Sequence, residues 1–127
     1  MNREIKFRCF YRGNMHQVKE LTMYMDGSMG VDSFIGEHFS PDSEHCSTLM
    51  QFSGLKDKNG VDIYEGDFIV DYKNALKGVV YFYAPQFIVQ TVQDNPYQLA
   101  KGMVNVKQLL DSEIIGNIYA NPELLTS

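Results

Sequence analysis

Residues 48–72 read TLMQFSGLKDKNGVDIYEGDFIVDY, in which short apolar runs alternate with glycine-containing turns. The clearest turn is Asp57-Lys58-Asn59-Gly60. Asn59 and Gly60 both tolerate a positive φ, which a type I′ hairpin turn requires at its two central residues. We therefore expect a β-hairpin with Asn59 and Gly60 at its tip.

A second tight turn follows at Glu65-Gly66-Asp67. Gly66 supplies the backbone freedom for a sharp corner, and Asp67 is expected to accept hydrogen bonds from local amides. Glu65 and Asp67 are two residues apart, so in an extended strand their carboxylates would share a face and could form an acid–base pair or bind a cation. The structural corner is the favoured interpretation.

The pattern of short strands and turns continues on both sides of this stretch. Asn121 is a favourable N-cap residue, and Pro122 after it is favourable at the first position of a helix. We therefore expect one helical turn at residues 122–125. We expect strands at residues 4–11, 15–25, 48–52, 68–72, 79–83, 87–92 and 113–119, with a partner strand ending near Ile35, turns at 12–14, 26–27, 75–78 and 95–96, and either a strand or a helical turn at 103–110.

Turn signals that recur about every eight to twelve residues predict a small antiparallel β-barrel or β-sandwich. Beyond residue 50 the chain has no room for the crossover helices of a parallel sheet. The expected fold is one mainly β domain over residues 1–127 with short helical turns. Residues 1–47 contribute strands and a polar loop at 36–47, and residues 48–127 form the barrel-like part.

The net charge of −5 is unevenly distributed over the 127 residues. Residues 1–20 hold five bases and two acids, whereas residues 21–71 hold ten acids and two bases. An acidic protein repels phosphate, so nucleic acid is not the expected main partner. The basic N-terminal strand keeps a nucleic-acid-binding small β-barrel as the alternative function.

The sequence also bears on location and on metal chemistry. No apolar run approaches the ~18 residues of a membrane span, and no apolar segment follows the N-terminal charges. We therefore expect a cytoplasmic protein with Cys9 and Cys46 as free thiols. His38, His45 and Cys46 belong to the polar loop region, but adjacent His45 and Cys46 are poorly spaced for one zinc ion. No metal or cofactor is expected.

Residues 79–92 are apolar on both faces of their two predicted strands. Either this hairpin lies in a two-sided core, which we favour, or one face meets a partner, where tyrosine is enriched. A small domain cannot bury all of the eight Phe and eight Tyr residues, so we expect self-association. The candidate interface residues are Tyr81, Tyr83 and Phe87.

Three segments, residues 3–8 (REIKFR), 49–67 and 115–125 (IGNIYANPELL), resemble the YopX family of phage and prophage proteins. Phe10-Tyr11 departs from an aromatic–acidic pair common at that point in the family. The resemblance implies a mainly β fold and a viral or prophage origin, so the cytoplasm expected above would be that of a bacterial host, and it implies no activity or catalytic residue. The Gly66-Asp67 corner also resembles, at the level of fold alone, the corner of SH3-like barrels.

The favoured function is therefore a non-enzymatic binding module that self-associates or docks on a host or phage protein. A nucleic-acid-binding barrel is second, and an enzyme using Glu65 and Asp67 is a distant third.

Overall fold

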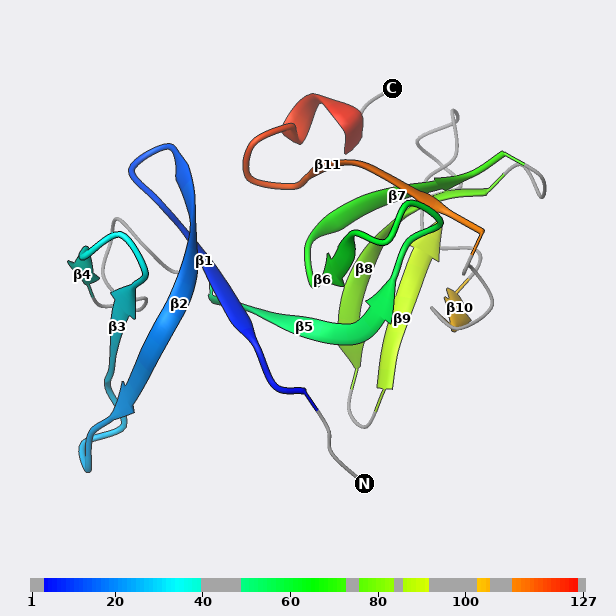
Figure 1. The fold of residues 1–127 in the computed structure, drawn as a ribbon. Helices are drawn as coiled ribbons and strands as arrows, with labels where there is room; N and C mark the ends of the chain where they lie inside the picture. The colour runs from blue at the N-terminus through cyan, green and yellow to red at the C-terminus, as the bar shows by residue number, and fades with distance from the viewer. Residues whose placement is uncertain are drawn as a thin grey trace. The chain divides into compact units, whose positions relative to one another are not determined.

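The computed structural model describes residues 4–39, 49–72, 76–83, 86–91, 103–105 and 111–125. Nearly all of the described elements are antiparallel β-strands, which confirms the mainly β prediction (Figure 1). The chain forms two compact units, Asn2–Gln51 and Phe52–Ser127. Among the described residues, no helix has the length and apolar character needed to cross a bilayer.

The N-terminal unit is an antiparallel sheet that curls around a small core. Its strands are β1 (Phe7–Tyr11), β2 (Asn14–Met23), β3 (Met29–Ser33) and β4 (His38–Phe39), and the first residues of β5 (Leu49–Lys56) pair with β1. Cys9 and Val31 are fully buried at the centre, where Val18, Leu21 and Leu49 pack against them. The period-two pattern of β1 thus places Cys9 inside, as an alternating strand requires.

The turn between β1 and β2 is the type I′ turn of this unit. Tyr11 pairs with Asn14, and the two residues between them, Arg12 and Gly13, have φ angles of 50° and 81°. Both central residues of a type I′ turn need positive φ. The turn lies where a turn was expected, at residues 12–14. Arg12 is the only residue other than glycine with positive φ in the described part of the chain, so its side-chain type gave no signal of its φ angle.

The C-terminal unit is a β-hairpin packed on a five-stranded sheet. Its elements are the rest of β5, β6 (Asp62–Tyr64), β7 (Asp67–Asp71), β8 (Leu76–Tyr83), β9 (Gln86–Thr91), β10 (Met103–Asn105), β11 (Glu113–Asn117) and the 3₁₀ turn η3 (Pro122–Leu125). The sheet order is β10-β9-β8-β7-β11. Leu55 and Ile63 of the hairpin pack with Ile69, Val80 and Val89 of the sheet. This layering is compatible with a small sandwich, and neither sheet closes into a barrel among the described strands.

The hairpin tip at residues 57–60 forms where it was expected but with a different turn. Gly60 has a φ of 81°, whereas Asn59 does not have a positive φ, so the turn is not type I′. Instead, the Gly60 N–H donates to the Asp57 carbonyl at 3.0 Å, and glycine takes the fourth position of the turn. Aspartate first and glycine fourth is the preferred pattern of a type I turn.

The turn predicted at residues 75–78 is wrong for residues 76–78. Leu76, Lys77 and Gly78 already belong to β8, where they pair with Asp71, Val70 and Ile69. Gly78 is buried in the sheet, so here glycine provides room in a strand and does not mark a turn. Residue 75 and the turn expected at residues 95–96 lie outside the described residues. Within residues 103–110, Met103–Asn105 is a strand.

The last strand and the closing turn are joined through Asn121. The β-bulge at Ile114–Gly116 interrupts β11, as the glycine in this strand suggested, and η3 follows. Asn121 directly precedes η3, as predicted, and its carbonyl accepts from the Leu124 N–H at 3.1 Å. Its Oδ1 atom accepts from the Asn117 N–H at 3.2 Å, so this side chain also braces the preceding loop. A Cβ atom at Gly116 would lie 2.5 Å from that Oδ1 atom, so a larger residue there would force the Asn121 side chain to move.

Candidate functional site

The hairpin tip of the C-terminal unit is held by Asp57, which is only 6% exposed. Its Oδ1 atom accepts from the N–H groups of Asn59 at 2.8 Å and Val61 at 3.0 Å, and its Oδ2 atom accepts from Ile114 at 3.1 Å. Burial alone would raise the pKa of Asp57, but these amides outweigh it and hold the pKa below its usual value. Asp57 therefore ties the β5–β6 hairpin to β11.

The corner at Glu65-Gly66-Asp67 is anchored on both sides. Gly66 has a φ of 85°, donates to the Val80 carbonyl at 2.8 Å and accepts from the Ile118 N–H at 2.9 Å. Asp67 is 1% exposed, and its Oδ2 atom accepts from the Tyr64 N–H at 2.8 Å. The Asp67 carboxylate is thus directed at the local backbone, as expected of a corner residue.

The predicted aromatic interface lies on β8 and β9. Tyr81 is half-buried; Phe87 packs against the core of the C-terminal unit and lies 4.9 Å, centroid to centroid, from the ring of Phe82. Tyr83 ends β8, and its side chain is outside the described part. Buried on both faces of this hairpin are Val79, Val80, Ile88 and Val89. The middle of the hairpin is therefore a two-sided core, and an interface role for Tyr81, Tyr83 and Phe87 stays a prediction.

The residues weighed as metal ligands do not come together where the chain is described. Cys9 is buried in the N-terminal core, and His45 and Cys46 lie outside the described residues. His38 is exposed on β4, with its Nδ1 atom 2.7 Å from Asp32 Oδ1 on β3. Among the described residues, no three His, Cys, Asp or Glu side chains are grouped as a metal site requires.

An exposed apolar surface lies on the N-terminal unit, and the sequence patterns did not reveal it. We call Met23, Tyr24 and Met25 the tip; they are 75%, 51% and 107% exposed at the turn between β2 and β3. Phe34 and Ile35, in the turn after β3, are 69% and 77% exposed. These five residues are half of the ten large apolar residues that are exposed in the described chain.

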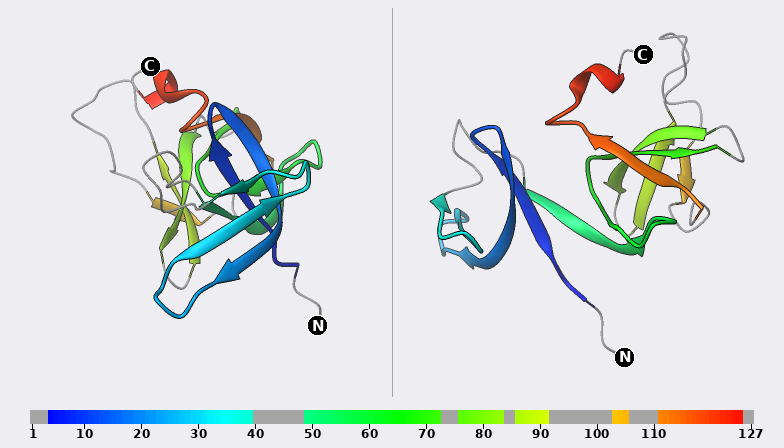
Figure 2. Two further views of the ribbon diagram at one scale, coloured as in Figure 1. Left: turned by 90° about the vertical axis from the view of Figure 1, so that its left-hand side faces the viewer. Right: turned by 45° about the horizontal axis from the view of Figure 1, so that its top comes forward.

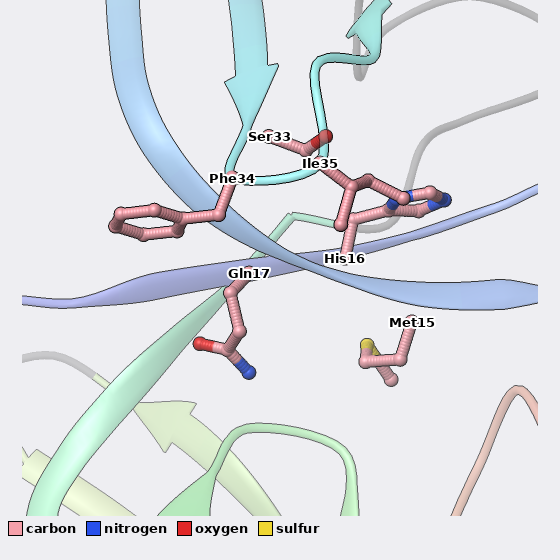
Figure 3. Close-up of a pocket in the computed structure, with 6 residues that line it drawn as sticks. All are labelled: Met15, His16, Gln17, Ser33, Phe34 and Ile35. Atoms are coloured by element: carbon pink, nitrogen blue, oxygen red, sulfur yellow. The ribbon is translucent and has the colours of Figure 1, made fainter.

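The turn after β3 also borders a pocket of about 210 Å³. It is lined by Met15, His16, Gln17, Ser33, Phe34 and Ile35 (Figure 3). Figure 3 shows Met15 and Gln17 on one side of the β2 ribbon and His16 with Ile35 on the other. Small-molecule sites usually occupy about 300 Å³ or more, so this pocket suits a single large side chain.

The backbone of the pocket is fixed by short hydrogen bonds. The Phe34 N–H donates to the Gln17 carbonyl at 3.2 Å, and the Ser33 Oγ atom accepts from the Glu37 N–H at 3.0 Å. Ser33 is 3% exposed, and its bond to Glu37 fixes the turn from the inside, whereas Phe34 and Ile35 remain at the surface. The sequence signal that could have revealed this surface is the placement of Tyr24-Met25 and Phe34-Ile35 beside Gly27 and Gly36, where apolar side chains lie on turns.

The comparisons with known proteins agree on the fold. A family model described as YopX protein matches residues 6–126. The crystal structure of protein EF1440 from Enterococcus faecalis superposes with a TM-score of 0.60 at 22% sequence identity, covering 98% of this chain and 99% of that one. At this identity the likeness shows the fold alone. No curated protein matches the chain.

Proposed function

The chain belongs to the YopX protein family, and from this premise we propose that it is a non-enzymatic binding module that self-associates through its N-terminal unit. A host or phage protein that docks on the same surface is the second class of partner, in keeping with the phage or prophage origin that the resemblance implies and with the bacterial cytoplasm expected from the sequence.

The observation that carries the proposal is the concentration of exposed apolar side chains on one unit. The tip and the residues Phe34 and Ile35 fall within thirteen residues of sequence, 23–35. Apolar surface gains about 25 cal/mol for each Å² removed from water, so side chains this exposed favour association. The tip and the pair Phe34 and Ile35 are two exposed apolar patches on this unit, and exposed apolar patches mark interaction sites.

The other candidate sites offer less to a partner. Phe87 is already packed in the core, and Tyr81 is half-buried, so little of their surface remains for association. Asp67 is buried and bonded to the Tyr64 amide, which leaves it badly placed to serve as an acid or base for a substrate. Surface binding by the N-terminal unit is therefore better supported than catalysis.

Light scattering on the full chain at high micromolar concentration tests the proposal. We expect a mass above that of the monomer, and a return toward the monomer for Met25→Ser and Ile35→Ser. The matched control is Val61→Ser, because Val61 is 52% exposed on the C-terminal unit. A wild-type chain that stays monomeric at this concentration contradicts self-association, and an effect limited to a Tyr81→Ser variant moves the interface to β8.

A further inference from the structure

Resting on the proposed self-association, we infer that two copies pair through their β2–β3 hairpins in an antiparallel arrangement, with the tip of each hairpin filling the pocket of the other. The occupant of the pocket is thus the Tyr24-Met25 end of a second copy of this chain.

The inference starts from the positions of the tip and the pocket on one hairpin. Met23 pairs with Met29 beside the tip, and Val18 pairs with Ser33 beside the pocket. The two features therefore lie at opposite ends of β2 and β3 (Figures 1 and 2). Strands rise about 3.3 Å per residue, so residues 17 and 23 are about 20 Å apart.

This separation is the same in every copy of the chain. When two hairpins align antiparallel, each tip therefore meets the pocket of the other copy, and a two-fold axis relates the two contacts. A closed pair leaves neither tip nor pocket available for a third copy, so growth stops at the dimer.

The exposed apolar area approaches what a stable pair needs. Large aromatic side chains present about 150–250 Å² each, and the five exposed residues together offer about 700 Å² per copy. A standard protein–protein interface buries about 800 Å² on each partner. The tip, Phe34 and Ile35 thus supply most of the surface that such an interface needs.

The charges between tip and pocket fit the same alignment. Placing Tyr24 opposite Met15 of the second copy also places Lys19 opposite the second copy's Glu20, next to the two-fold axis. Lys19 and Glu20 are both exposed. The β-bulge between Val18 and Glu20 leaves Lys19 with no register partner on β3, and bulges commonly redirect a side chain out of the sheet. Two opposite-charge contacts then favour this pairing over others.

A charge-complementation experiment tests the geometry. Lys19→Glu and Glu20→Lys each place like charges on both sides of the axis, so each variant alone should dimerise about tenfold or more weakly. In an equimolar mixture, one copy carries two acids and the other two bases at these positions, so a heterodimer of wild-type mass should reappear. Asp111→Lys, exposed on the C-terminal unit, makes the same charge change as Glu20→Lys and should dimerise like the wild type.

Sedimentation velocity separates the possible failures. If the wild type is a dimer but the mixture of the two variants does not form a heterodimer, the antiparallel pairing is overturned and self-association stands. A wild-type mass that grows beyond the dimer overturns the closed pair. A monomeric wild type overturns both the pairing and the proposed function. Circular dichroism checks that the surface variants remain folded.

Discussion

Asp57 shows how one side chain can join segments that are distant in sequence. Its carboxylate accepts from two amides of its own hairpin tip and from the amide of Ile114, which is 57 residues away. Beside it, the Lys58 N–H donates to the Ser112 carbonyl at 2.9 Å, and the Lys58 Nζ atom lies 3.7 Å from Glu113 Oε2. The turn is thus both the end of a hairpin and a point of attachment for β11.

Replacing Asp57 with asparagine should destabilise the chain by about 1–3 kcal/mol at neutral pH, because an amide nitrogen cannot accept from a buried N–H. The folded-state pKa of Asp57 is lowered, so its contribution is complete above the unfolded value of about 3.9 and is lost as pH falls through the folded value. Urea unfolding at neutral pH and near pH 3 measures the difference between wild type and variant, which should shrink in acid.

The matched control for Asp57 is Asp111→Asn, since Asp111 is exposed on the same unit. It should leave the free energy of unfolding nearly unchanged at neutral pH. Equal losses for the two variants would show that the Asp57 network contributes no more than a surface charge.

Residue-level features were predictable where the chemistry is local. The corner at Gly66 and Asp67 follows from the conformational freedom of glycine and the reach of aspartate to its own backbone. The bond between Asp57 and Ile114 was not predictable, because it depends on which strand lies beside the turn. The turn at residues 12–14 was predictable from Gly13 and Asn14, but the positive φ of Arg12 was not, because the β1–β2 pairing sets it and the side chain does not.

At the scale of elements, period-two patterns located most strands within a few residues. They failed at the start of β8, because Leu76-Lys77-Gly78 carries a glycine that is typical of turns. They also failed to distinguish buried from exposed apolar positions near the ends of β2 and β3. The period-two pattern indicates which residues share a face of a strand. The exposure of the tip depends instead on how far the β2–β3 hairpin extends beyond the core of its unit.

The β2–β3 tip should be dispensable for folding. Met23 pairs directly with Met29, so an Asn-Gly sequence in place of residues 24–28 gives the two-residue loop preferred in hairpins. We expect the free energy of unfolding to change by less than about 1 kcal/mol, because Met25 contributes no buried surface. The same variant should lose self-association in light scattering; a large loss of stability would show instead that the tip packs within its own unit.

At the scale of the whole molecule, charge bears on the choice of partner. The net charge is −5, and residues 21–71 alone balance at −8. We expect no tight binding of duplex or single-stranded oligonucleotides in anisotropy titrations at moderate salt, because phosphate is repelled. A sub-micromolar affinity that weakens as salt rises would support the nucleic-acid-binding alternative.

The mainly β class was predictable because short apolar runs separated by turn residues recur along most of the chain. The two parts expected from the sequence divide between residues 47 and 48, whereas the boundary between the compact units follows Gln51 inside β5, where composition does not change. β5 pairs with β1 through residues 49–51 and with β6 through Phe52 and Lys56. One continuous strand therefore contributes hydrogen-bonded pairs to both units.

The position of β11 has a consequence for synthesis on the ribosome. β7 lies between β8 and β11, and β11 pairs with it through residues Glu113–Asn117. A nascent chain that has emerged only as far as β10 therefore presents β7 as an open edge, with Asp57 still lacking the Ile114 amide. Unprotected edges pair readily with other chains, so translational pausing before residue 113 should favour aggregation through β7, which β11 covers once it has formed.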